Sequence, residues 1–235
     1  MGNGFGEKQY INFPLPLLRN LMYYKTRTLR GVIVYEALRT GKDWHVVLYE
    51  IGTTQYKELH ELGCSQNELY RKYRNSMSMV LDKINSGMFE RQPSVGIKSS
   101  TLRDYLYNEK TEEDWTMLLL WLSVKSISKE LICKTSGEYI VARMAGYKTF
   151  EEMKRDYPNT SQYLVALIED GGTGRTARDR RRKLYDRLEA TYKRVYFFGG
   201  FKCVWVVRSN NVISRDEAQK RLEEYRASLR PGPPS

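Results

Sequence analysis

The sequence contains few of the residues from which metal centres and most catalytic sites are built. Its 235 residues include only three cysteines and two histidines. A structural zinc site needs four soft ligands, usually supplied as closely spaced pairs, whereas Cys64, Cys133 and Cys203 are widely separated. We interpret His45 and His60 as structural or surface residues. The sequence therefore predicts no metal site, no cofactor and no enzymatic activity, and a DNA-processing enzyme is the least favoured class.

Long apolar runs are also lacking. The longest, at 117–122 and 163–168, are far too short to cross a bilayer. The first ten residues, MGNGFGEKQY, do not combine a basic start with an apolar core as a signal peptide does. The lack of a signal-peptide pattern and the odd number of cysteines together favour reduced thiols. We expect a cytoplasmic protein without a membrane partner.

Positive charge is what the sequence has in excess. Lysine and arginine number 39 against 28 acidic residues, which gives a net charge of +11 and a pI near 9.5. Such a balance favours an anionic partner, with nucleic acid ahead of a membrane surface. The 41% of hydrophobic residues suffice for a packed core. The length predicts one to two domains, and we place the joint between them at 108–113.

The first half of the chain contains a strong helix signal at 65–85. Ser65 and Glu68 have the spacing of a capping box. The predicted inward stripe consists of Leu69, Tyr73, Met77, Val80 and Ile84. A strand at 44–51 and a short helix at 54–62 are expected before this helix, and a hairpin formed by 89–91 and 95–98 after it. Polar and cationic side chains on the outer face are candidate nucleic-acid ligands: Asn67, Arg71 and Arg74.

The strongest feature is the basic segment 174–194. It contains nine basic and three acidic residues. Thr176 is placed to cap a helix, whose predicted core side is Leu184, Leu188 and Tyr192. The cations gather in the first two turns, where a helix inserted into a groove meets DNA and where the helix dipole favours phosphate. The candidate ligands here are Arg175, Arg178, Arg181, Arg182 and Lys183.

Further elements are expected around this segment. Helices are predicted at 112–128, 136–144 and 161–169. A hairpin formed by 194–198 and 201–207 should turn at Gly199-Gly200, with Lys202 and Arg208 on its second strand. A helix at 214–229 carries the apolar stripe Ala218, Leu222, Tyr225 and Leu229. We expect this last helix to pack back on the body; the alternative is a homodimer contact.

In both halves a capped helix with a polar outer face precedes a predicted hairpin. Through 62–68 with its helix and through 176–207, the chain resembles the tandem winged helix-turn-helix architecture of plasmid and phage replication initiators, over about residues 12–208. The resemblance implies a mainly α fold with small β-hairpins (α+β), with two winged-helix-like domains at 10–108 and 111–210 and a C-terminal helix at 214–229.

The resemblance also implies a function. The protein would bind double-stranded DNA sequence-specifically at an origin or operator and have no chemistry of its own. Arg71, Arg178, Arg181 and Arg182 would contact phosphates and bases, with Lys202 on the wing. Replication or transcription machinery would be further partners, and a mobile element would be a fitting source. The alternatives are a transcriptional regulator and an RNA-binding or protein-interaction module.

Overall fold

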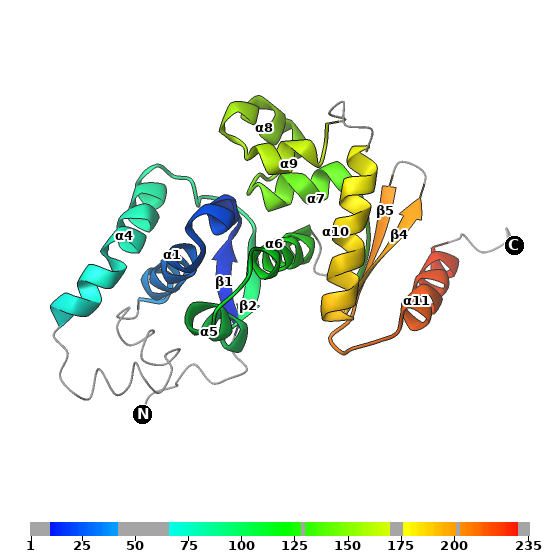
Figure 1. Ribbon diagram of the computed structural model, residues 1–235, viewed down its shortest axis with the longest axis horizontal. Coiled ribbons are helices and arrows are strands. Elements are labelled where there is room, and N and C mark those ends of the chain that lie inside the picture. The colour runs from blue at the N-terminus through cyan, green and yellow to red at the C-terminus, as the bar shows by residue number, and fades with distance from the viewer. Residues whose placement is uncertain (1–9, 42–65, 128–129, 170–175, 201–202, 230–235) are drawn as a thin grey trace, which may run out of the picture. The chain divides into compact units, whose positions relative to one another are not determined.

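A computed structural model describes residues 10–41, 66–127, 130–169, 176–200 and 203–229, without the side chains of 66–73 and Gly200. The fold is mainly helical with small antiparallel sheets, which confirms the predicted α+β class (Figure 1). The chain divides into two compact units, Met1–Leu122 and Ser123–Ser235.

The core of the first unit forms where a two-stranded sheet meets a long helix. Its elements are β1 (Tyr10–Pro14), α1 (Leu15–Thr40), α4 (Gln66–Asn85), β2 (Ser94–Lys98), α5 (Ser99–Tyr107) and α6 (Glu112–Ile127), the last of which continues beyond Leu122. In the antiparallel register Ile11 lies opposite Ile97, and Phe13 lies opposite Val95. All four side chains are buried. Alternation along both strands thus gives the sheet one apolar face.

The long helix α1 is interrupted at Lys25, where φ is 39° and ψ is −113°. A non-glycine residue rarely adopts a positive φ, so this position is strained. The Thr28 hydroxyl donates a hydrogen bond to the Asn20 carbonyl across the break, at 3.0 Å. Close to Gly31, α4 packs on α1 through buried Val80; an added Cβ at Gly31 would lie 2.8 Å from Cε of Met79.

Two predictions for the first half are wrong. No hairpin links 89–91 to 95–98, because β2 pairs with β1, whose buried side chains complete the same apolar face. The inward stripe predicted for α4 is wrong in part, because Val80 is buried as expected whereas Ile84 is 40% exposed and the small polar Ser76 is buried. The predicted strand at 44–51 and helix at 54–62 lie outside the described residues.

The second unit is built around a three-stranded sheet. Its elements are β3 (Ile132–Thr135), α7 (Gly137–Met144), α8 (Phe150–Arg155), a 3₁₀ turn (Tyr157–Asn159), α9 (Gln162–Ala166), α10 (Ala177–Tyr192), β4 (Val195–Gly200), β5 (Cys203–Arg208) and α11 (Arg215–Ser228). The strand order is β3-β5-β4, and both pairings are antiparallel. The predicted hairpin is therefore present and carries a third strand.

Successive side chains of β4 point to opposite faces of this sheet. The Phe197 ring stacks on Tyr185 of α10, with 4.1 Å between ring centroids. Tyr196 instead joins Val207, Ala218 and Leu222 in a buried cluster beneath α11. Figure 1 shows the strands between α10 and α11. The expectation that the C-terminal helix packs back on the body is thus confirmed.

Three details of this unit differ from expectation. Gly199 and Gly200 pair with Val204 and Cys203, so both lie within β4 rather than forming the turn; glycine permits a turn without requiring one. Arg208 lies on β5 as predicted, but it is only 8% exposed and its Nη2 donates to the Glu130 carbonyl. Leu229 lies beyond the end of α11 and is 58% exposed, so it does not belong to the inward stripe.

Candidate nucleic-acid interface

The basic helix α10 begins with a side-chain cap, as its sequence predicts. The Thr176 hydroxyl accepts a hydrogen bond from the Asp179 amide at 3.3 Å and donates one to the Asp179 carboxylate at 2.9 Å. This satisfies one of the amides that the first turn leaves without an intrahelical partner. The helix therefore starts just before its run of cations.

The inner face of α10 is fixed mainly by its C-terminal half. Leu184, Tyr185 and Leu188 are buried, and Glu189 is 9% exposed. Burial raises the pKa of Tyr185 well above its usual range, an effect that nearby Arg181 partly offsets, so this phenol stays neutral. The predicted core residues Leu184 and Leu188 are confirmed, whereas Tyr192 is only half-buried.

Glu189 joins the helix to two other elements. Its Oε1 accepts a hydrogen bond from the Phe197 amide at 2.7 Å, and its Oε2 pairs with Arg215 of α11. The Arg215 guanidinium also lies over the Phe198 ring, 4.9 Å from the ring centroid. One of the three acidic residues of the basic segment thus has an internal role.

Two arginines of the segment bind backbone carbonyls within the unit. Arg180 donates from Nε to the Ala166 carbonyl at 2.6 Å and from Nη2 to the Glu169 carbonyl at 2.5 Å. Arg181 donates from Nη1 to the Leu167 carbonyl at 2.5 Å. These oxygens lie at the end of α9 and just after it, where a helix leaves its last carbonyls without intrahelical donors.

Glycine at the start of α7 makes room for Arg181. An added Cβ at Gly137 would lie 2.6 Å from the Arg181 Nε. The Arg181 side chain therefore lies across the first turn of α7 and reaches the end of α9. The sequence shows that Arg181 is a cation, but no local pattern predicts that it packs against Gly137 and binds the Leu167 carbonyl.

The remaining candidates on α10 point outward. Arg178, Arg182 and Lys183 are all exposed. Asp179 and Asp186 are exposed as well, so the outer face is positive without being uniformly cationic. Charges of both signs on one helix face can orient a bound polyanion, because phosphates are attracted to one part and repelled from the other.

The other predicted site residues are distributed as follows. Asn67, Arg71 and Arg74 lie on α4 of the first unit, where Arg74 is exposed and the side chains of the other two are not described. Arg175 and Lys202 lie outside the described residues. The structure thus brings Arg178, Arg181, Arg182 and Lys183 onto one helix, with Arg181 turned to its own unit.

Within the described ranges, no group of three or more His, Cys, Asp or Glu residues could hold a metal ion. No helix there has the length and apolar character needed to span a membrane. Compared with known proteins, the chain matches no family model, no curated protein and no solved structure.

Proposed function

We propose that the protein binds double-stranded DNA, in the manner of plasmid and phage replication initiators, and that α10 is the element that enters the groove. The observation that carries this proposal is the division of α10 into an anchored face and an exposed cationic face. Leu184, Leu188 and Glu189 hold the helix in its unit, while Arg178 and Arg182 face solvent one turn apart. A recognition helix requires both properties.

The order of elements around α10 supports the same proposal. Helix α10 leads directly into the antiparallel hairpin β4–β5, and β3, which precedes α7, adds the third strand beside β5. This order resembles that of a winged-helix domain, in which the hairpin after the recognition helix forms the wing. We propose a winged-helix-like domain in the second unit on this basis. For the first unit, a similar proposal depends on α4 and its exposed Arg74.

The proposal is tested first by selecting bound sequences from a random duplex library, beside single-stranded DNA and RNA. Affinity for the selected duplex is then measured by fluorescence anisotropy at several salt concentrations. The double variant Arg178→Gln/Arg182→Gln should bind more weakly, and the slope of log K against log salt should become shallower by about 0.9 for each lost phosphate contact.

The matched control is Lys148→Gln/Lys220→Gln, which removes two exposed cations from elsewhere in the second unit. It should leave the slope nearly unchanged. Selection of RNA over duplex DNA, or equal slopes for the two double variants, would overturn the proposal.

A further inference from the structure

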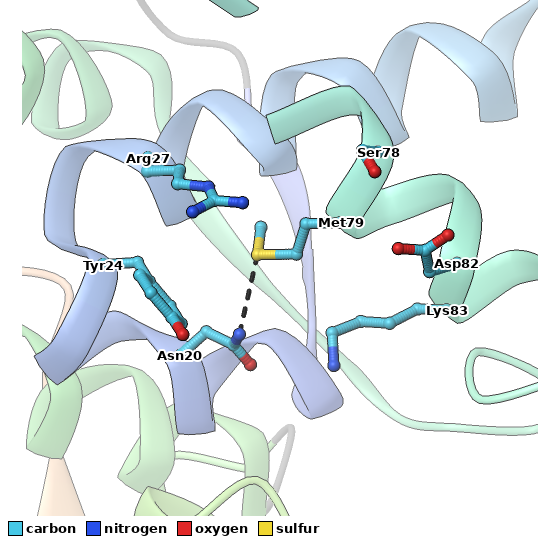
Figure 2. Close-up of a pocket in the computed structure, with 7 residues that line it drawn as sticks. All are labelled: Asn20, Tyr24, Arg27, Ser78, Met79, Asp82 and Lys83. Atoms are coloured by element: carbon cyan, nitrogen blue, oxygen red, sulfur yellow. Dashed lines mark hydrogen bonds between the residues drawn. The ribbon is translucent and has the colours of Figure 1, made fainter. Parts of the chain in front are cut away.

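A hollow of about 270 Å³ lies between α1 and α4 in the first unit (Figure 2). It is lined by Asn20, Tyr24, Arg27, Ser78, Met79, Asp82 and Lys83. Its volume is several times that of a water molecule and slightly less than that of typical sites for drug-sized ligands, which start at about 300 Å³. The hollow therefore suits a small polar group.

Two cations from different helices face this hollow. Arg27 of α1 lies over the Tyr24 ring, 5.1 Å from its centroid, and its Nη2 donates to the Asn75 carbonyl at 3.1 Å. Lys83 of α4 is half-buried, and its Nζ lies 3.4 Å from the Met88 sulfur, which is a weak acceptor. Figure 2 shows the Arg27 guanidinium and the Lys83 ammonium on opposite sides of Met79 and Asn20.

The electrostatic environment of Lys83 favours an added negative charge. Burial lowers the pKa of Lys83, and the nearby positive charge of Arg19 lowers it further. The lining holds two cations, Arg27 and Lys83, and one acidic side chain, Asp82, so its formal charge is positive. An anion bound in the hollow would offset the repulsion between these cations and the cost of burying Lys83.

Polar atoms without partners occur on the α1 side of the hollow. Among the described residues, the Nε of Arg27 and the Oδ1 of Asn20 are buried and have no hydrogen-bond partner. The Asn20 Nδ2 donates to the Met79 sulfur, at 3.5 Å. Most buried polar atoms have partners, so these two are exceptions in the packing beside the hollow.

We propose that this hollow binds a phosphate group, with Arg27 and Lys83 as its cationic ligands. A phosphate offers several strong acceptor oxygens to the Arg27 guanidinium and the Lys83 ammonium. The strained backbone position Lys25 lies between Tyr24 and Arg27 in the sequence. The phosphate would come from a free nucleotide or from a nucleic-acid backbone.

The site is tested in a chain that carries Arg178→Gln/Arg182→Gln, so that phosphate bound at α10 does not contribute. Inorganic phosphate and a nucleoside 5′-monophosphate are titrated separately, with ³¹P NMR line width as the readout and chloride holding the ionic strength constant. Saturable binding is expected, and adding Arg27→Gln or Lys83→Met should weaken it about tenfold or more. Lys83→Met keeps the apolar stem of the side chain, and thermal unfolding checks that each variant is folded.

Lys98→Gln is the control, because Lys98 is an exposed cation of the same unit outside the hollow. Its binding should equal that of the parent. Competition by a short duplex identifies the backbone as the source of the phosphate, and preference for the monophosphate without competition identifies a free nucleotide. Absence of saturable binding, or equal weakening by Lys98→Gln, overturns the site while leaving the DNA-binding proposal at α10 untouched.

Discussion

Neighbouring arginines of α10 have different surroundings although their side chains are chemically the same. Arg181 donates to the Leu167 carbonyl and lies across Gly137, whereas Arg182, one position further, is exposed. A helix turns by about 100° per residue, so one step moves a side chain from packing to solvent. The charge of the basic segment is therefore divided between internal contacts and the outer face.

This division predicts unequal effects on stability. Arg181→Gln should lower the free energy of unfolding by about 1–2 kcal/mol, because the Leu167 carbonyl loses a charged donor. Arg182→Gln should change it by less than about 0.5 kcal/mol. Urea unfolding measures both values. Replacing Arg181 and Arg182 by glutamate together should therefore lower stability as well as DNA binding, because Arg181 loses its contact with the Leu167 carbonyl.

At the scale of elements, α11 is part of the core of its unit. Ala218 and Leu222 are fully buried with Tyr196 and Val207, and Arg215 reaches Glu189 on α10. Ser214 caps the helix by accepting a hydrogen bond from the Glu217 amide at 3.1 Å. The apolar face of α11 is therefore used inside its own unit, where it stabilises the fold.

Two leucines near the end of the chain should therefore behave differently. Leu222→Ala should destabilise the protein by about 2–4 kcal/mol, because it leaves a cavity beneath α11. Leu229→Ala should cost less than about 0.5 kcal/mol, because this side chain is already 58% exposed. Thermal and urea unfolding measure both. Equal costs would contradict the packing of α11 described here.

At the scale of the whole molecule, exposed candidate cations occur in both units. Arg74 lies on α4 in the first unit, and Arg178, Arg182 and Lys183 lie on α10 in the second. If one duplex contacts both units, their phosphate contacts add in the salt dependence of binding.

We expect Arg74→Gln to make the slope of log K against log salt shallower by about 0.9, the value for one phosphate contact. Lys98→Gln, which removes an exposed cation of the same unit, should leave the slope unchanged. The measurement is the same salt titration with the selected duplex. An unchanged slope for Arg74→Gln would show that Arg74 contacts no phosphate of the bound duplex.

The local features of the fold could be predicted from sequence. The capped helix at 176–194, the hairpin after it and the helix at 214–229 all carry strong short-range signals, and α10, β4, β5 and α11 occupy these positions. Strand pairing over long separations could not be predicted. From sequence, β2 could pair with more than one neighbouring segment. It pairs with β1 because the two strands together form one apolar face that includes Ile11 and Phe13.

The sequence by itself determined the excess of positive charge, its concentration in one capped helix and the shortage of metal-binding residues, because these depend on composition and spacing alone. Only the tertiary structure decided which cations face solvent. It turned Arg181 toward Leu167, buried Arg208 and placed Arg27 and Lys83, which are far apart in the chain, around one hollow. The reason is that the neighbours of a side chain come from segments that are distant in the sequence, and a local sequence pattern does not specify which segments fold next to each other.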